Sequence, residues 1–442
     1  MFGFGNLGDE AIQTSVASNL GRREQSVSLE FVCLSPQDVA RKFRVPAHDI
    51  FSGESVKAPH SGVANRIDAV ENSHNRADVF DPAGVHTLSA RQRLIGVARS
   101  VPLVRELLAA VWRFREHKRS LLRIHRIVAD LDLLLISGSG VLDDTWSGRW
   151  RRPRALFLWC RAAADAGVPV VFASIGATSL KTRKGKRFAR EALQLADYRS
   201  YRDKESITLA RSLGVDVTSD AVCPDLAFSM DELVLARARD AASTKTAPRV
   251  SIGPIPYSED RHWHTPDTAK ASRYRTSIAR LATTLADQGI HVGFALGHAV
   301  VDLLAVNKVE EEIGLQSQER RDRIDEHIAI SDLQSLMNAL AKTDVVVTSR
   351  FHGVLLSLML GKPVVALSYD SKIDNLMAEF DLEDSTFPIG DFDVTDVAKS
   401  VRVLLRTQGS LSPQLIERSA AYRQQLDAQF EKILRIARAH SG

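Results

Sequence analysis

The sequence predicts an α/β fold made of two doubly wound domains. Short apolar, β-branched runs alternate along the chain with segments of helical periodicity, which is the pattern of parallel sheets covered by helices. The clearest run, residues 344–349, has no polar alternation and is therefore expected to be buried on both faces of a sheet. A polar stretch at residues 236–248 separates two such halves and is expected to connect them.

The first domain is expected at residues 1–240 and the second at residues 249–410, followed by a C-terminal helical segment at residues 411–442. In the first domain, the pattern predicts helices at residues 153–166 and 185–196 and strands at residues 28–34, 131–137, 168–174, 198–202 and 215–218. In the second, it predicts strands at residues 249–252, 291–295, 344–349 and 364–368 and helices at residues 276–288, 332–342, 354–360 and 374–380. Residues 52–90 are rich in Ser, Gly, Asn, His and Asp and predict a loop or insertion over the space between the domains.

Composition indicates an intracellular protein without a metal site. The 442 residues are 44% hydrophobic and 25% charged, which suffices for two ordinary cores. Cys33, Cys160 and Cys223 are too dispersed for a disulfide framework or a zinc ribbon, and the loop histidines have no ligand spacing. No apolar run approaches the roughly 18 to 20 residues that span a bilayer, and the amino terminus lacks the apolar region of a signal peptide. We therefore expect a cytoplasmic protein whose only membrane contact would be peripheral, at the inner face of the cell membrane.

Residues 91–126 carry an unusual positive charge. Ten lysines and arginines stand there against two acids, Glu106 and Glu116, so the segment has a net charge of +8 against +4 for the whole chain. Interleaved apolar residues predict amphipathic helices with a basic face. This face is either simply solvated or rests against anionic lipid headgroups or a diphosphate-linked glycan. Nucleic acid is not expected as a partner, because no RNA-binding or helix-turn-helix signature accompanies the charge.

Arg350 and His352 follow the buried run at residues 344–349. They are expected on a strand-to-helix turn at the carboxyl end of the sheet, where open α/β sheets bind ligands. The free amides and positive dipole of the following helix favour an anion there. An arginine at this point can grip a carboxylate or phosphate, and a histidine can move a proton. The alternative is a helix-capping histidine beside a surface arginine.

Two glycine-punctuated loops precede this turn in the chain. The first contains Gly5, Asn6 and Gly8 and runs into a helix with Asp9 and Glu10 in its first turn. The second follows the predicted strand at residues 131–137 and contains Gly138, Ser139 and Gly140, with Asp143 just beyond.

Together with Ser349-Arg350-Phe351-His352-Gly353, these loops resemble three motifs of the polysaccharide pyruvyl transferase family, in the family's order. Three further segments resemble the family, at residues 201–206, 223–228 and 366–372. The resemblance therefore covers roughly residues 2–390. It implies a GT-B-like arrangement, in which two Rossmann-like domains face each other and bind the ligand in the cleft between them.

The chain departs from the family pattern at two places. Members usually have an apolar strand before the first glycine loop. Here the first residues of the sequence, from Met1, already belong to that loop. We therefore expect either that the first strand of the sheet is missing or that the natural product begins upstream of Met1. The second departure is Ser139, where the family more often has glycine, and its side chain is expected to narrow the space for a ligand.

The resemblance implies transfer of a pyruvyl group from phosphoenolpyruvate (PEP) to two hydroxyls of a sugar. The acceptor would belong to a cell-surface polysaccharide or a lipid-linked saccharide, the product would be a cyclic ketal, and no cofactor would be needed. PEP carries a carboxylate and a phosphate, so Arg350 and Arg202 are candidates for an anion clamp, with Lys372 as a further cation. Ion pairs of Arg202 and Lys372 with nearby acids such as Glu205 or Asp374 are the structural alternative.

The proton transfers require an acid and a base. His352 is the candidate acid, and Asp9 or Glu10 the candidate base, although carboxylates in a first helical turn often serve only the helix dipole. The remaining candidates are expected to shape the acceptor side or border the cleft, and they are Gly5, Asn6, Gly8, Glu10, Gly138, Ser139, Gly140 and Asp143.

Two other functions fit the same fold. A glycosyltransferase that uses a nucleotide sugar would need an acid near the ribose, for which Glu379 or Asp381 could serve. A catalytically inactive binding protein would be expected to lack Arg350 or His352, and both are present.

Overall fold

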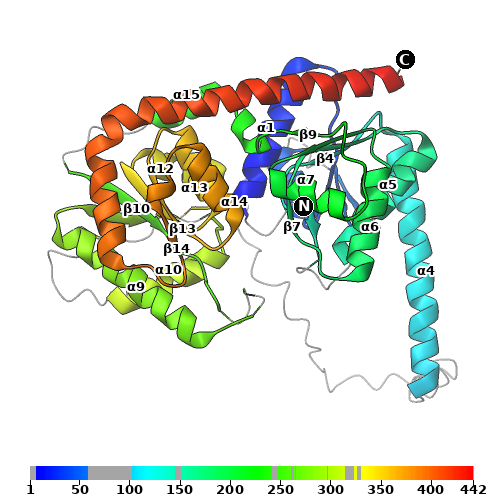
Figure 1. The fold of residues 1–442 in the computed structure, drawn as a ribbon. Coiled ribbons are helices and arrows are strands. Elements are labelled where there is room, and N and C mark those ends of the chain that lie inside the picture. Colours follow the sequence, from blue (N-terminus) through cyan, green and yellow to red (C-terminus); the bar gives the residue numbers. More distant parts are fainter. Residues whose placement is uncertain are drawn as a thin grey trace, which may run out of the picture.

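The computed structural model describes residues 6–57, 102–144, 151–240, 247–259, 263, 265–295, 297–313, 323–325 and 330–441, with the side chains of residues 102–113, 178–179 and 441 left out (Figure 1). Gly5, most of the loop predicted at residues 52–90, and residues 91–101 of the basic segment lie outside this range.

The first domain contains a parallel sheet of four strands in the order β4-β6-β8-β9. These strands are β4 (Leu134–Ser137), β6 (Val170–Ile175), β8 (Tyr198–Tyr201) and β9 (Ala221–Val222). A second sheet joins β1 (Phe31–Cys33) in parallel to β2 (Ala47–Asp49), which pairs antiparallel with β3 (Ser55–Val56). A short pair links β5 (Leu142–Asp143) to β7 (Ala177–Ser179). The helices are α1 (Leu7–Arg23), α2 (Pro36–Phe43), α4 (Pro102–Ala129), α5 (Arg151–Ala166), α6 (Arg183–Gln194) and α7 (Lys204–Ser212).

One predicted strand of this domain is wrong. Residues 215–218 form no strand; they follow Gly214, whose φ of +81° lies just beyond the end of α7. The short strand β9 follows three residues later and closes the edge of the sheet. After it, η1 (Leu226–Ser229) and α8 (Glu232–Asp240) lead out of the first domain.

The second domain is built on five parallel strands in the order β11-β10-β12-β13-β14. Their bounds are β10 (Arg249–Gly253), β11 (His291–Phe294), β12 (Val345–Thr348), β13 (Val364–Ser368) and β14 (Thr386–Pro388). The surrounding helices are α9 (Thr268–Asp287), α10 (Val301–Ile313), α12 (Leu333–Ala341), α13 (Phe351–Met359) and α14 (Ser371–Glu379), with the short η2 (Glu383–Ser385) before β14. Every residue of β12 and β13 is buried, as the apolar runs predict.

The final helix, α15 (Val394–Ser441), belongs to both domains. Figure 1 shows it running along the second domain, bending, and then crossing to the first. Pro413 lies inside this helix, and a proline there removes one backbone hydrogen bond, which accounts for the bend. The boundary predicted at residue 410 therefore falls near a bend in one helix, not between two separate segments.

The two domains share a hydrophobic core. Its buried residues include Leu7 and Ile12 of α1, Val347 of β12 and Phe430 of α15. In the part of α15 beyond Pro413, Gln429 accepts a hydrogen bond from Ser200 and donates one to Ser174, at 2.9 and 3.1 Å. The first domain has a second core around β6, α5 and α6.

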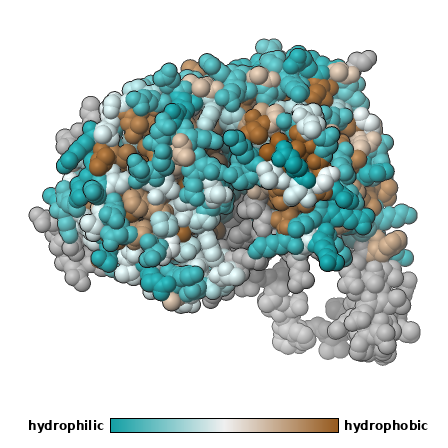
Figure 2. Space-filling model, viewed as in Figure 1, coloured by the Kyte–Doolittle hydropathy of each residue, from teal (hydrophilic) through white to brown (hydrophobic). Residues whose placement is uncertain are grey.

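The described part of the basic segment forms a single helix, α4, of 28 residues. It extends beyond the body of the first domain in Figure 1. Phe114 on its surface is 69% exposed. Among the described helices, none combines the length and apolar character needed to cross a membrane. On the face seen in Figure 2, hydrophobic side chains lie in small patches between polar ones.

Candidate functional site

A pocket of about 170 Å³ lies between the two domains, at the carboxyl ends of their strands. Loops after β4, β8, β12 and β13 contribute to its wall, as expected for a ligand site in open α/β sheets. It brings together nine of the residues predicted from the sequence, which are Asn6, Gly8, Asp9, Ser139, Gly140, Arg202, Arg350, His352 and Lys372.

Three helices begin at this pocket. Asn6 caps α1, because its side-chain oxygen accepts from the amides of Gly8 and Asp9 at 3.1 and 3.4 Å. Arg350 is the N-cap residue of α13 but makes no side-chain capping bond, and Asp370 caps α14 by accepting from the amide of Lys372 at 3.2 Å. The positive ends of the three helix dipoles therefore converge on a small volume, which favours an anion.

His352 lies in the first turn of α13 and faces α1. A Cβ added at Gly8 would lie only 2.0 Å from its Nδ1, so the backbone of α1 packs directly against the imidazole. On the other side, Nε2 lies 3.8 Å from Oδ2 of Asp225, close enough for an ion pair but too far for a hydrogen bond. The ring of Phe351 packs edge to face against the imidazole at 5.2 Å.

Asp225 is a buried carboxylate that links His352 to Arg202. Its side chain is 1% exposed, and it accepts from Nη1 of Arg202 at 3.2 Å and from the amide of Ala227 at 3.0 Å. Burial alone would raise its pKa, but His352, Arg202 and the amide outweigh that effect and lower the pKa to about 2. Asp225 is therefore ionised at neutral pH and holds the guanidinium of Arg202 and the imidazole of His352 in place.

Arg202 follows β8, where its amide donates to the carbonyl of Ile175 at 3.0 Å. Its guanidinium lies over the ring of Phe351, 4.7 Å from the centroid, and only 8% of the side chain is exposed. A Cβ at Gly176 would approach the guanidinium to 2.5 Å, so glycine makes room for it. The acids that Arg202 contacts are Asp225 and Asp203; the alternative partners Glu205 and Asp374 make no such contact.

Arg350 is fixed by a second buried carboxylate, Asp302, in the first turn of α10. Its Nε lies 3.1 and 3.2 Å from the two carboxylate oxygens, and its Nη2 also binds Oδ1. Asp302 additionally accepts from the amides of Gly297 and His298, at 3.0 and 2.9 Å. Burial would lower the pKa of Arg350, but Asp302 outweighs it and raises the pKa. The side chain remains 29% exposed, so the guanidinium is accessible from the pocket.

Lys372 lies in the first turn of α14. Its ammonium is 2.8 Å from Oδ2 of Asp370, a residue of the same turn. The predicted ion-pair alternative is thus present, but with Asp370 and not with Glu205 or Asp374. The side chain is 22% exposed and still lines the pocket.

Asp9 and Ser139 contact each other in the pocket wall. Asp9 accepts from the hydroxyl of Ser139 at 2.9 Å and from the side-chain amide of Asn6 at 3.0 Å. Ser139 has a φ of +56°, a left-handed conformation that is ordinarily taken by glycine. The departure from the family pattern at this position therefore adds a hydroxyl that fixes the carboxylate of Asp9.

The other predicted residues lie outside this pocket. Glu10 is buried, accepts from the amide of Leu333 at 3.2 Å and pairs with Lys42, so it connects α1 to α12. Gly138 has a φ of +51° and packs against Ile12. Asp143 is buried in β5, and Gly5 is among the residues that the structure does not describe.

Sequence reasoning missed the two carboxylates that anchor the arginines. Asp225 stands in the Cys-Pro-Asp stretch that resembles the family, and its place just after a short strand was a usable signal. Asp302 lies in a helix that was not predicted, and no motif surrounds it. Phe351 and Tyr369 of the pocket wall were also passed over.

The acids proposed for a nucleotide-sugar donor are engaged elsewhere. Glu379 accepts from the hydroxyl of Tyr422 at 2.8 Å, and Asp381 pairs with Arg418 at 2.7 Å. Both contacts tie the end of α14 to α15. In the part of the chain that the structure describes, no cluster of three or more His, Cys, Asp or Glu side chains could hold a metal ion.

Comparison with known proteins adds a family and a fold. The family model described as polysaccharide pyruvyl transferase matches residues 6–371. No curated protein matches the chain. Among solved structures, UDP-GlcNAc 2-epimerase from Neisseria meningitidis bound to UDP-GlcNAc is similar with a TM-score of 0.53 and 11% identity, over 95% of this chain and 97% of that one. Sucrose-phosphate synthase from Thermosynechococcus elongatus follows with a TM-score of 0.45 and 12% identity, over 73% and 78%. The first similarity confirms the predicted fold, a GT-B-like pair of facing Rossmann-like domains.

Proposed function

Because the chain belongs to the polysaccharide pyruvyl transferase family, we propose that it transfers the pyruvyl group of PEP to a saccharide, forming a ketal. The observation that carries this proposal is the arrangement of Arg202 and Arg350 around His352. Each arginine is anchored to a buried carboxylate and has its guanidinium in the wall of one small pocket. A dianionic or trianionic donor with two separate acidic groups fits such a pair.

The donor is proposed to bind through its carboxylate and phosphate. Arg350 and Arg202 can each form paired, charge-assisted hydrogen bonds with one of these groups. Lys372 and the amides at the start of α13 and α14 supply further positive potential. These groups suffice to hold PEP without a metal or a cofactor.

The reaction then needs three proton movements. His352 is proposed to protonate the methylene carbon of PEP, which leaves C2 cationic, and the first sugar hydroxyl attacks C2 as Asp9 takes its proton. The second hydroxyl then displaces phosphate, which leaves with that hydroxyl's proton, so the products are the cyclic ketal and inorganic phosphate. Asp9 and Ser139 are hydrogen-bonded to each other in the pocket wall, and they are proposed to serve the acceptor side. Asp225 acts as a positioning residue that orients His352 and Arg202.

The direct test is binding of PEP to the metal-free protein. Arg350→Ala should weaken PEP binding, measured by calorimetry, by at least about 1.5 kcal/mol, the lower range for a charged hydrogen bond. Arg187→Ala, at a 70% exposed arginine of α6, is the matched control and should leave the affinity unchanged. Equal affinities in folded Arg350→Ala and in the unmodified protein would reject the clamp.

Product formation must be tested separately. Labelled PEP, incubated with a panel of free and lipid-linked saccharides, should give a labelled ketal and free phosphate. Nucleotide sugars, added alone in a thermal-shift assay, should not stabilise the protein as PEP does. Stabilisation by a nucleotide sugar but not by PEP would favour a glycosyltransferase instead.

A further inference from the structure

The functional pocket has room for the donor but not for a sugar as well. Its volume of about 170 Å³ lies below the roughly 300 to 1,000 Å³ of most ligand pockets. Because the proposed reaction joins the donor to a saccharide, the sugar ring has to be held at the rim of this pocket. The two arginines and Lys372 serve the anionic donor, so the ring needs a different contact.

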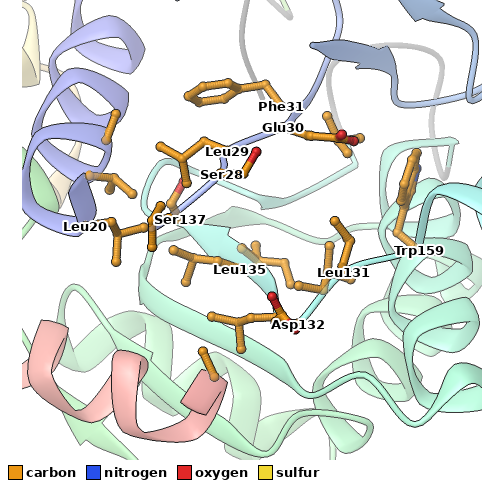
Figure 3. A pocket seen from close by; sticks show the side chains of 18 of the residues that line it. Leu20, Ser28, Leu29, Glu30, Phe31, Leu131, Asp132, Leu135, Ser137 and Trp159 are labelled. Atoms are coloured by element: carbon orange, nitrogen blue, oxygen red, sulfur yellow. The ribbon is translucent and has the colours of Figure 1, made fainter. Parts of the chain in front are cut away.

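A larger cavity inside the first domain cannot hold this sugar. It has a volume of about 680 Å³ and lies between Leu29 and Leu135, with Leu20 and Trp159 at two further sides (Figure 3). None of the residues that line it also lines the functional pocket, so a sugar bound there could not reach the donor. The contact for the sugar ring has to come from the wall of the functional pocket itself.

Tyr369 is an exposed aromatic side chain of that wall. It follows the last residue of β13, precedes the N-cap residue of α14, and is 37% exposed. Its backbone is fixed on both sides, because the carbonyl of Ser368 accepts from the amide of Ile389 at 2.8 Å and Asp370 caps α14. Tyr369 therefore reaches the pocket from the same end of the sheet as Lys372.

A row of packed aromatic rings supports Tyr369 from the second domain. The ring of Trp263 makes a T-shaped contact with that of Tyr369, with centroids 5.3 Å apart. Tyr257 contacts Trp263 in the same manner at 5.0 Å, and Tyr274 contacts Tyr257 at 5.5 Å. Tyr274 is buried in the shared core, and Tyr257 and Trp263 pack against that core. The row thus begins in the core and ends at the pocket, and its packing fixes the orientation of the exposed ring.

The T-shaped contact leaves at least one face of the Tyr369 ring uncovered by Trp263. In such a contact the edge of one ring meets the face of the other, here with an angle of 69° between the planes. If Trp263 presents the edge, it covers one face of Tyr369. If Tyr369 presents the edge, Trp263 covers neither face. A face of Tyr369 is therefore available to a ligand, in agreement with the exposure of the side chain.

The face of an aromatic ring favours a sugar over an anion. Its π-electrons make the face negative, so it repels a carboxylate or a phosphate. A pyranose ring presents C–H groups on its face, which carry a slight positive charge and are apolar enough to pack on an aromatic ring. Its hydroxyls project at the edge of the ring. Asp9 lines the same small pocket as Tyr369, so hydroxyls of a sugar packed on Tyr369 can reach this carboxylate.

We propose that Tyr369 is the platform on which the acceptor sugar packs with the C–H face of its ring, and that Trp263 is the positioning residue that holds this platform. The inference rests on the proposed function and adds to it the contact that selects the acceptor, a pyranose residue without a charged substituent. The platform and the donor clamp are separate side chains. Their removal should therefore affect the affinities for sugar and for PEP independently.

Saturation-transfer difference NMR on the 442-residue chain tests the platform directly. The probes are the methyl glycosides of glucose, galactose, mannose and N-acetylglucosamine, added without PEP. At least one of them should receive saturation mainly at the C–H protons of one ring face. The signal should be lost in Tyr369→Leu and kept in Tyr369→Phe, which retains the ring. Phe114→Leu, at a 69% exposed aromatic residue of α4, is the matched control and should keep the signal. No transfer to any probe, or equal transfer in Tyr369→Leu, would overturn the proposal.

Steady-state kinetics with a saccharide that accepts label from PEP separates the sugar contact from the donor site. Tyr369→Leu should raise the KM for the saccharide about tenfold, the upper range for an aromatic contact, and leave the PEP affinity measured by calorimetry within about twofold. Trp263→Ala should raise the same KM by a smaller factor with little change in kcat, because the Tyr369 ring is still present but less firmly held. A tenfold loss of PEP affinity in Tyr369→Leu would assign the ring to the donor and reject the platform.

Two rival arrangements give different results. A neighbouring cavity of about 140 Å³ shares Arg202, Phe351 and Lys372 with the functional pocket, whereas Asn375 lines only that cavity. If Asn375→Ala raises the KM for the saccharide more than Tyr369→Leu does, the sugar lies in that cavity and the proposal fails. It also fails if UMP, and none of the glycosides, receives saturation that Tyr369→Leu removes, because the ring then stacks on a base. Binding of a glycoside to a protein that does not bind PEP would instead reject the proposed function and leave the platform in place.

Discussion

The arginines of the pocket depend on two buried carboxylates, Asp225 and Asp302, that are not part of the pocket wall. A guanidinium that is largely buried needs a charged partner, and removing that partner leaves an uncompensated charge. Asp225 and Asp302 supply this partner and also receive backbone amides, so their own positions are fixed. The remaining N–H groups of Arg202 and Arg350 are thereby presented to the pocket in a set orientation before any ligand arrives.

His352→Gln should separate turnover from binding. Glutamine keeps much of the size and polarity of the imidazole but cannot transfer a proton in the same way, so kcat is expected to fall about a hundredfold to ten-thousandfold. The KM for PEP should change little, since the arginines remain. Steady-state kinetics at several PEP concentrations measures both values. Normal kcat would make His352 a structural part of the α13 terminus.

Because the pKa of Asp225 is lowered in the folded protein, we expect the stability of the fold to depend on pH. Its pKa is lowered from 3.8 to about 2, so the ionised form stabilises the fold at pH above about 4, and this contribution is lost as the pH falls toward 2. Asp225→Asn should therefore melt well below the unmodified protein at pH 6, and the difference should shrink between pH 4 and pH 2. Asp165→Asn, a half-exposed partner of Arg161, should give a small difference throughout. A constant difference for Asp225→Asn would contradict the assigned ionisation.

Among individual residues, the sequence predicted those that line the pocket better than the carboxylates that support them. Arg350, His352 and Arg202 follow strands and resemble family motifs, and the structure places all three in one pocket. Asp302 could not be predicted, because it reaches Arg350 across 48 positions of sequence and its helix carries no motif.

Among the elements, α1 and α13 meet end to end at the pocket. Gly8 in α1 allows the contact, because any Cβ there would overlap His352. The start of α13 was predicted three residues too late, since Arg350 offers no capping side chain and Gly353 resembles a helix breaker. Phe351 and His352 therefore belong to the first helical turn and not to a loop.

Gly8→Ala should impair the site through this contact. The added methyl group must displace His352 or the start of α1, so kcat should fall at least tenfold even though the residue itself carries no reactive group. Gly21→Ala, on the same helix with nothing within 4 Å, should keep full activity and gain about 0.5–1 kcal/mol from helix propensity. Full activity in Gly8→Ala would show that the contact can relax without consequence.

The basic face of α4 is either solvated or rests against an anionic surface, and charge reversal distinguishes the two. Replacing the exposed residues Arg115, Lys118 and Arg119 by glutamate should weaken sedimentation with phosphatidylserine vesicles at least tenfold, since each basic residue near such a surface contributes about 1 kcal/mol. PEP affinity should stay the same, and raising the salt concentration should mimic the change. The matched control replaces Lys270, Arg273 and Arg280 of α9 and should bind vesicles normally. Equal binding of both triple variants would make α4 a solvated face.

For the whole molecule, the two-domain organisation was predictable and the shared core was not. Apolar periodicity predicts which segments form sheets, but it does not indicate that α1 packs against α12 and α13 of the other domain. The path of α15 was likewise not predictable, because contacts such as Gln429 with Ser174 join residues 255 positions apart.

Phe430→Ala should test how far α15 holds the molecule together. Phe430 is fully buried, lies beneath Arg23 of α1, and its truncation is expected to cost about 3–5 kcal/mol. Val403→Ala, at a 49% exposed position on the same helix, should cost little. Chemical denaturation measures both free energies of unfolding. A loss below about 1 kcal/mol for Phe430→Ala would mean that this end of α15 adds little to stability.

Because α15 bends at Pro413, a small rotation at the bend becomes a large displacement farther along the helix. Beyond the bend, the helix is a stiff arm of about 40 Å, at roughly 1.5 Å per residue. A rotation of about 5° at the bend would therefore move Gln429, which lies roughly 24 Å along the arm, by about 2 Å. The hydrogen bonds of Gln429 to Ser200 and Ser174 are 2.9 and 3.1 Å long, so even that rotation would break them. Rotation of one domain relative to the other is therefore limited to a few degrees while Gln429 stays hydrogen-bonded to Ser200 and Ser174.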